Sequence, residues 1–322
     1  MAAIAPFQNP SYGQSLVQFA TTSGLFLMLV ALMHVLPWFL ASLLTLPAAG
    51  MLVRLFIIQH DCGHGSFFPS RHWNTVIGNV CSIATLTPYA FWRRQHANHH
   101  ASFNNLDRRD HGADLYSSCC TVQEYQALSS FHRWLYRIYN HPIITQIVLP
   151  PIIFFAVYRL PLNAPLPTWQ RERRSLYLTN FAILCNLAFL IALFGVLSVL
   201  RVEIPVMIVA SIIGVWLFSV QHRFEETLWA RQSSWTLVNA SLRGSSYLKL
   251  PRILQWFTGN IGFHHVHHLT SLIPNYRLQA CHDANPELFD AATTLTLHEA
   301  LRAPYFALWD ETQGRMLRFK DV

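Results

Sequence analysis

Charged residues are scarce in this sequence. Asp, Glu, Lys and Arg together make up 12% of its 322 residues, against 52% hydrophobic residues, and none of the four occurs before Arg54. Soluble domains carry about 25% charged residues, because their surfaces face water. The deficit argues against a cytosolic protein and indicates a chain embedded in a lipid bilayer. We expect a single integrated domain over residues 1–322.

Signatures of bound redox cofactors are also absent. The six cysteines form no C-x-x-C pair and no regular spacing of the kind found in disulfide frameworks or iron–sulfur sites, so we expect reduced thiols. The sequence has no flavin or dinucleotide fingerprint and no fused haem domain. Any redox chemistry of this chain therefore requires electrons from a separate protein.

Acidic residues are fewer than basic ones, which gives a formal net charge of +7. No nucleic-acid-binding motif accompanies the basic residues, so we expect no nucleic-acid partner. Most of them lie in the segments 59–175 and 221–322, outside the longest apolar runs. Because cytoplasmic loops of membrane proteins are enriched in Lys and Arg, we expect both segments to face the cytoplasm, at a bacterial inner membrane.

Four apolar runs are long enough to cross a bilayer as helices, which takes about 20 residues each. Two of them form a predicted hairpin over about residues 16–58, with Pro37 and Trp38 at its turn, and two form another over about residues 176–220. Two shorter runs, Val76–Trp92 and Ile143–Tyr158, are predicted to be interfacial or re-entrant. With four crossings, all remaining long segments lie on one face of the membrane.

Histidine is unusually frequent, with 17 residues, most of them in tight clusters. The clusters are H-D-C-G-H from His60, H-A-N-H-H from His96 and H-H-V-H-H from His264, and His222 follows an apolar run. On a helix, residues three and four apart share a face, so each cluster can converge on a metal ion. The histidines exceed the ligand set of one zinc ion, which suggests two metals. Imidazole chemistry leaves iron, copper and zinc open.

The predicted fold is therefore all-α. It is an integral membrane protein with four transmembrane helices in two hairpins, interfacial helices, and a cytoplasmic helical cap that holds the metal site.

The order and spacing of the clusters resemble those of the membrane fatty acid desaturases, and the resemblance covers nearly the whole chain. It includes N-L-D-R-R from Asn105, Q-H-R-F-E-E-T from Gln221 and G-N-I-G-F-H-H-V-H-H-L from Gly259, strings similar to those of bacterial and cyanobacterial acyl-lipid desaturases. The resemblance implies a di-iron centre whose ligands are His60, His64, His96, His99, His100, His222, His264, His267 and His268. His265 is a possible further ligand, although on a helix it points about 100° away from His264.

Residues that orient the ligands are also expected, because metal-bound histidines usually donate their second ring N–H to a carboxylate or carbonyl group. The candidates near the clusters are Asp61, Asp107, Asp110, Glu225, Glu226 and Asn260. Possible walls of an acyl-chain tunnel are Trp92, Trp229 and Trp256.

The resemblance also implies an activity. It predicts an O₂-dependent oxidoreductase that introduces a cis double bond into the acyl chain of a membrane lipid, with two iron ions as cofactor and a separate ferredoxin as electron donor. A related di-iron lipid hydroxylase or carotenoid ketolase would use the same metal chemistry. A non-enzymatic metal transporter would place its polar ligands near the middle of its spans, whereas these clusters follow the predicted helix ends.

Overall fold

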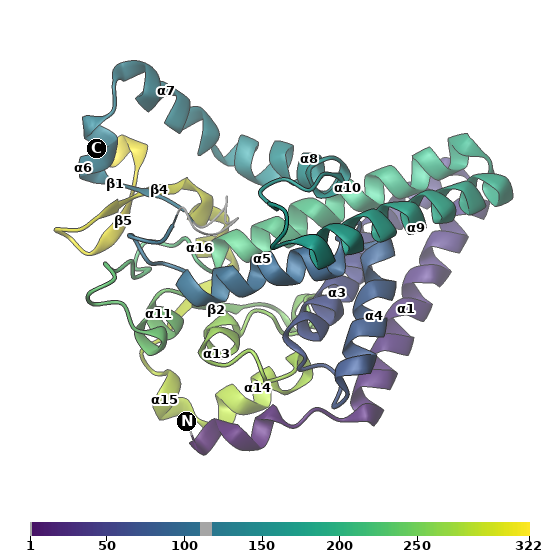
Figure 1. Cartoon of the computed structure of the whole chain (residues 1–322), viewed down its shortest axis with the longest axis horizontal. Coiled ribbons are helices and arrows are strands. Elements are labelled where there is room, and N and C mark those ends of the chain that lie inside the picture. The colour runs from purple at the N-terminus through teal and green to yellow at the C-terminus, as the bar shows by residue number, and fades with distance from the viewer. Residues whose placement is uncertain (1, 110–117) are drawn as a thin grey trace.

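The computed structural model describes residues 2–109 and 118–322. Most of these residues are helical, and the long apolar helices extend to one side while the strands gather on the other (Figure 1). The long helices are α1 (Tyr12–Val35), α3 (Thr45–His64), α9 (Gln170–Phe194) and α10 (Val196–Val220).

Three of these helices, α1, α9 and α10, are long and apolar enough to cross a membrane. α9 and α10 are joined at Gly195, whose φ of 79° turns the chain directly from one helix into the next. Phe181, Leu184 and Phe189 of α9 are exposed although they are large and apolar, as expected of a helix that faces lipid. The helical hairpin expected over residues 176–220 is therefore present.

The span expected after Trp38 is not one continuous helix. α2 (Trp38–Leu43) is separated from α3 by Leu44, which caps the end of the one helix and the start of the other. Most of α3 is buried, because it packs against α1, α4 (Arg71–Ala84) and α10. α3 contains Arg54 and the first histidine cluster, and these polar residues lower its mean hydropathy. A helix can contain such residues where protein surrounds it. Apolar composition did not distinguish burial in protein from burial in lipid.

The two shorter apolar runs have different structures. Val76–Trp92 covers the end of α4 and the start of α5 (Tyr89–Ser102), and its side chains Ile77, Cys81 and Phe91 are buried in the protein core. The second run forms η2 (Ile144–Val148), α8 (Leu149–Phe155) and η3 (Val157–Arg159). Together with α7 (Ser130–Tyr139) this run makes a pair bent by 45°, as a broken span or a re-entrant segment would.

The remaining segments form a cap around the ends of the long helices. Its short helices are η1 (Ala2–Gln8), α6 (Val122–Ala127), α11 (Leu237–Arg243), α12 (Arg252–Phe257), α13 (His264–Leu269), α14 (Asn275–Ala284), α15 (Pro286–Phe289), α16 (Leu297–Arg302), η4 (Ala303–Tyr305) and η5 (Phe319–Asp321).

The cap also contains two small sheets that the all-α expectation missed. One has the order β1–β4–β5, with β1 (Cys120–Thr121) parallel to β4 (Phe306–Asp310) and β4 antiparallel to β5 (Arg315–Arg318). The other pairs β2 (Ser246–Lys249) with β3 (Thr293–Thr296) in parallel. Strands of two to five residues are too short for an alternating pattern to show in the sequence.

Candidate metal centre

Four segments bring histidines together where the long helices meet the cap. α3 carries His60 and His64 one turn apart in its last turns, and Gly65 (φ 76°) ends the helix directly afterwards. α5 presents its three histidines at helical spacing, His222 follows the end of α10, and α13 consists largely of the third cluster. The structure therefore gathers all four sequence elements in one place.

The histidines form two groups whose candidate ligand atoms lie within 4.8 Å of one another. The first group is His60, His64, His96, His100 and His267, and the second is His99, His222 and His268. His264 adjoins the second group, because its Nε2 lies 2.9 Å from His222 Nε2 and 3.0 Å from His268 Nε2. All nine histidines expected as ligands are thus brought together.

The distances between ring nitrogens match those of ligands that share an ion. In the first group, Nε2 of His100 lies 3.1 Å from Nε2 of both His96 and His267. In the second group, His99 Nε2 and His268 Nε2 are 3.4 Å apart. Two nitrogens held about 2.0–2.1 Å from one ion, at angles between 90° and tetrahedral, are about 2.9–3.4 Å apart. The donor set therefore fits a metal site.

The protonation state of the rings also suits metal binding. Burial lowers the pKa of five histidines well below the usual value, and neighbouring imidazoles lower it further: His96, His100, His264, His267 and His268. These rings are neutral at pH 7, so each has a lone pair available for a metal.

A buried chain of hydrogen bonds holds His60. Its Nδ1 donates to Asp61 Oδ1 (3.0 Å), which leaves Nε2 for a metal. Asp61 Oδ2 accepts from the backbone N (2.6 Å) and Nδ2 (2.8 Å) of Asn275, and Asn275 Oδ1 accepts from Gln18 Nε2 (2.8 Å). Asp61 thus lies where the sequence predicted. Asn275 and Gln18 were not predicted, because no sequence spacing relates α1 and α14 to the first cluster.

Other contacts support the remaining rings. His222 Nδ1 lies 3.2 Å from the carbonyl oxygen of Gly244, a hydrogen bond that directs Nε2 towards the second group. Trp92 stacks on His96 at 4.6 Å and 15°, and the Phe103 ring lies 4.2 Å from that of His268. Aromatic packing therefore limits the movement of both histidines.

Several other predicted supporting residues have different partners. Asp107 accepts from Arg231 and from the backbone N of Gln232, and Glu225 pairs with Arg315 at 3.0 Å. Glu226 is exposed, and Asp110 lies outside the described residues. These carboxylates were predicted because they are close to the histidine clusters in sequence. Asp107 and Glu225 instead form solvent-facing ion pairs with arginines.

Asn260 and His265 also point to other groups. Asn260 donates through Nδ2 to the carbonyl oxygen of Asn275 (3.1 Å), so it braces the residue that holds Asp61. His265 Nε2 lies 3.1 Å from His282 Nδ1, in an aromatic cluster with Phe289. Because α13 is helical, His265 points about 100° away from His264, so its ring meets His282 and not the two histidine groups.

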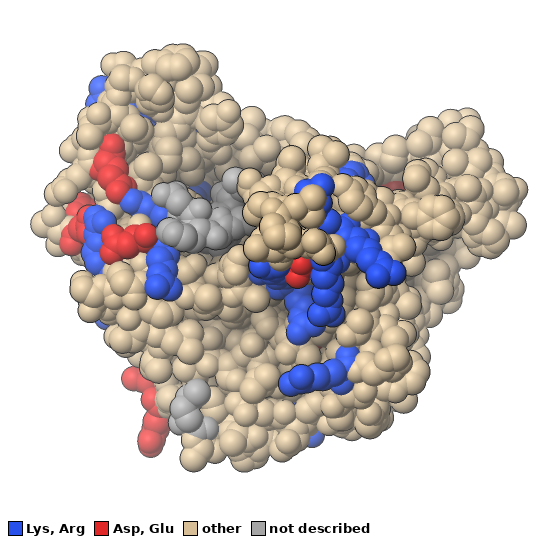
Figure 2. Space-filling model, viewed as in Figure 1, with Lys and Arg blue, Asp and Glu red and all other residues tan. Residues whose placement is uncertain are grey.

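Arginines gather on the surface beside the first histidine group. α5 contributes Arg93 and Arg94 just before His96, and the start of α9 contributes three more. Arg94 pairs with Glu172 at 3.2 Å, which joins the two helices. Figure 2 shows basic side chains concentrated over this part of the face in view. We define the basic surface as Arg93, Arg94, Arg171, Arg173 and Arg174.

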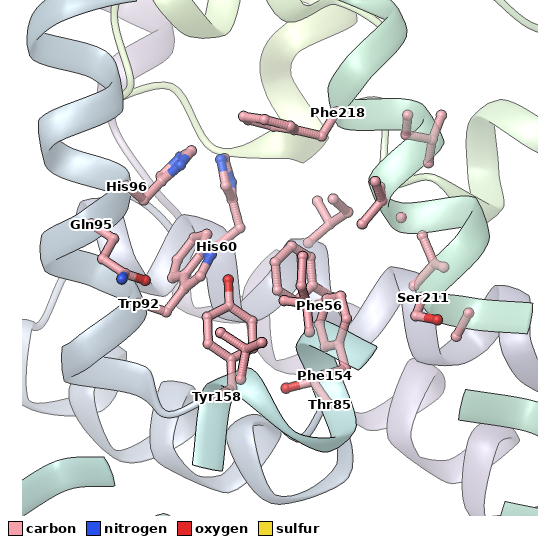
Figure 3. A pocket seen from close by; sticks show the side chains of 18 of the residues that line it. Phe56, His60, Thr85, Trp92, Gln95, His96, Phe154, Tyr158, Ser211 and Phe218 are labelled. Carbon is pink, nitrogen blue, oxygen red and sulfur yellow. The ribbon is translucent and has the colours of Figure 1, made fainter. Parts of the chain in front are cut away.

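An apolar cavity of about 490 Å³ adjoins the histidines. It lies between α3, α5, α8 and α10, and His60, His96, His99 and His264 form part of its lining. Figure 3 shows His60, His96 and Trp92 on one side of this space and Ser211 of α10 on the other.

The three tryptophans predicted as tunnel walls have separate positions. Trp92 lines the cavity, as predicted. Trp229 is instead buried in a cluster with Leu106 and Trp309, and Trp256 packs beneath the Arg54 guanidinium, 4.4 Å from its carbon. The aromatic character of a residue does not by itself predict whether its side chain lines the cavity.

Known proteins with related sequences identify the group to which this chain belongs. The family described as fatty acid desaturase matches residues 19–299. A protein named fatty acid desaturase from Bacillus subtilis is 39% identical over 322 residues, which cover 99% of this chain and 90% of that protein.

More distant relatives carry more specific names. The sn-1 acyl-lipid omega-3 desaturase (ferredoxin) of Synechocystis is 28% identical, over 86% of this chain and 76% of that protein. The acyl-lipid omega-3 desaturase (cytochrome b5) of Arabidopsis thaliana is 26% identical, over 77% of this chain and 64% of that protein. Like these relatives, the chain is an oxidoreductase, which decides against the transporter considered above. Together with the histidine groups and the apolar cavity, these matches show that the chain belongs to the fatty acid desaturase family.

Proposed function

We propose that this protein introduces a cis double bond into the acyl chain of a membrane lipid, using O₂, two iron ions and electrons from a separate ferredoxin. The observation that carries the proposal is the position of two histidine groups against an apolar cavity. The Synechocystis relative is named as an acyl-lipid desaturase that uses ferredoxin, which supports both the substrate class and the donor.

The two histidine groups would each hold one iron ion. His60, His64, His96, His100 and His267 supply the first set of ligands, and His99, His222, His264 and His268 supply the second. Iron bound there supplies the redox chemistry with O₂ that removal of hydrogen from an unactivated methylene requires, and zinc has no such redox chemistry. Asp61 and the Gly244 carbonyl keep His60 and His222 in the tautomer that presents Nε2.

The cavity would bind the acyl chain beside these ligands. Phe56, Phe154 and Val215 form part of its apolar wall, so burial of methylenes against them drives binding. Because His60 and His96 line the same space, a bound chain passes next to the metal ligands. The wall also excludes water from the reacting carbons.

The proposed topology places two hairpins in a bacterial inner membrane, α1 with α2–α3 and α9 with α10, and the metal centre in the cap on the cytoplasmic face. His34 near the end of α1 lies 2.9 Å from Ser198 near the start of α10, through Nδ1 and Oγ. The turns of the two hairpins therefore adjoin, while α3 and α10 both end at the histidines. The arginines of the basic surface favour a cytoplasmic position for that end.

Expression in a bacterial host that lacks polyunsaturated lipids tests this function. With ferredoxin and its reductase co-expressed, we expect new cis double bonds in the host's acyl lipids, which mass spectrometry locates along the chain. His222→Ala serves as the inactive control. Unchanged lipids in a host that accumulates the iron-loaded protein would count against desaturation, and hydroxylated chains would indicate the related hydroxylase chemistry.

The basic surface suits an acidic electron donor, because complementary charge raises the rate of encounter. We expect Arg171→Ser with Arg174→Ser to slow reduction by ferredoxin about three- to tenfold at low salt. The difference from wild type should vanish near 1 M salt, where charges are screened within about 3 Å. Stopped-flow measurement of electron transfer provides the readout.

Lys249→Ser with Arg252→Ser is the matched control for this experiment, since both residues are exposed and lie outside the basic surface. An equal slowing in the control would show that only overall charge matters. Unchanged rates in both variants would place the donor elsewhere.

A further inference from the structure

One wall of the cavity is formed by α10, whose small residues Ser211 and Gly214 leave space inside it. The residues of α10 in the lining include Met207, Ser211, Gly214, Phe218 and Gln221, which recur every three or four positions and so form a single row along the helix. Gly214 is at the centre of the row. A Cβ at Gly214 would meet no atom within 4 Å, so the space beside it is part of the cavity.

Gly214 lies in the inner part of the cavity, away from the histidines. With a rise of 1.5 Å per residue, it is about 12 Å before His222 along α10. α3 packs against α10 and also ends at the histidines, and its lining residues extend back from His60 to Leu52. The cavity therefore continues about 12 Å from the metal ligands between these two helices.

The two ends of the cavity differ in exposure. Leu52, Val53, Met207 and Ala210 are buried, so the part of the cavity near Gly214 is enclosed by protein. Leu160 and Leu162 also line the cavity but are 53% and 49% exposed. An acyl chain attached to a bulky lipid headgroup would enter beside these exposed leucines, so that its methyl end would reach the part near Gly214.

We propose that Gly214 determines how long an acyl chain the cavity accepts beyond the carbons that are oxidised. The proposal rests on the desaturase function proposed above, and it assigns the specificity for chain length to one position of α10. A side chain at residue 214 occupies the space that the last methylenes of a long chain fill. Each displaced methylene weakens binding about fourfold, which corresponds to ~0.8 kcal/mol per buried methylene.

The test compares Gly214→Ala and Gly214→Leu with wild type in the desaturating host. The host is given fatty acids of graded length, from myristic to stearic acid, together with palmitoleic and oleic acids. New double bonds are counted and located by mass spectrometry. We expect Gly214→Leu to lower the ratio of desaturated long chains to desaturated short chains at least about tenfold, as loss of two or more methylene contacts requires. Gly214→Ala should lower it two- to fourfold.

Gly24→Leu is the matched control, because Gly24 is also in a long apolar helix and a Cβ there also meets no atom within 4 Å. Gly24 is exposed on α1, outside the cavity, so this variant should keep the wild-type ratio. Bound iron, measured in all variants, shows whether the metal centre has formed. If Gly214→Leu does not accumulate, Gly214→Ala carries the comparison, since its added methyl group has open space.

Two negative results are distinguishable. An active Gly214→Leu with the wild-type chain-length ratio and bond position would overturn the role of Gly214 and leave the desaturase function intact. A wild-type protein that introduces no double bond into any chain would overturn the proposed function, and the role of Gly214 with it. A double bond moved towards the methyl end would support the proposal, because it shows that the chain enters less far.

Discussion

Replacement of His267 by alanine is expected to abolish iron binding at one of the two sites and to lower desaturation at least about 100-fold. His267 is buried in the first histidine group, with Nε2 3.1 Å from His100 Nε2. Loss of a partner that only orients a ligand costs about 10–100-fold in metal affinity or activity, and loss of the ligand itself should cost more. Metal analysis of the purified protein and turnover with reduced ferredoxin measure both effects.

His265→Ala is the matched control for this prediction. His265 is equally buried on the same short helix, but its Nε2 meets His282 and not the histidine groups. We expect this variant to keep its iron and to lose about 1–3 kcal/mol of stability, because the buried ring of His265 and its hydrogen bond to the half-buried His282 are both lost. Equal loss of iron in both variants would mean that the integrity of α13, and not ligation by His267, controls metal binding.

The second large effect is expected at Asp61. Removal of its carboxylate in Asp61→Ala leaves His60 Nδ1 without its acceptor and the Asn275 amide without its main partner. We expect the affinity for iron to fall about 10–100-fold. Asn275→Ala should have a smaller effect, about tenfold or less, since the backbone N of residue 275 still donates to Asp61 Oδ2. Titration of the metal-free protein with ferrous iron measures both affinities.

Asp107→Ala controls for the loss of a nearby polar group. Asp107 lies in an exposed ion pair with Arg231, and such pairs contribute little, so its removal should leave iron affinity unchanged. If Asp107→Ala weakened iron binding as much as Asp61→Ala, the role assigned to the Asp61 carboxylate would be wrong.

The gathering of the histidines was largely predictable because these residues carry a repeated local pattern. Histidines three and four residues apart mark a helical face wherever they occur, so the three clusters could be recognised without knowledge of the fold. His222 was recognisable from its position after an apolar run. Asn275 and Gln18 could not be found in this way, since their role depends on α14 and α1 meeting beside α3.

The membrane helices were less predictable than the site. α9 is exposed along most of its length and α10 over its first turns, so their apolar composition indicates directly that they are candidate membrane spans. α3 is apolar because protein surrounds it, and its break from α2 at Leu44 carries no Pro or Gly signal at that residue. The short strands of the cap pair segments far apart in the chain, such as Ser246–Lys249 with Thr293–Thr296, and no local pattern specifies such a pairing.

The hydrogen bonds that join Gln18, Asn275 and Asp61 have a consequence for biogenesis. Gln18 of α1 and Asn275 of α14 are 257 residues apart in the chain, and Gln18 is translated first. His60 therefore lacks its complete support while the chain is still growing. The support of His60 can be completed only after residue 275 has been translated and α14 has packed against α3, so insertion of α1 and α3 can precede the final ordering of the histidine groups.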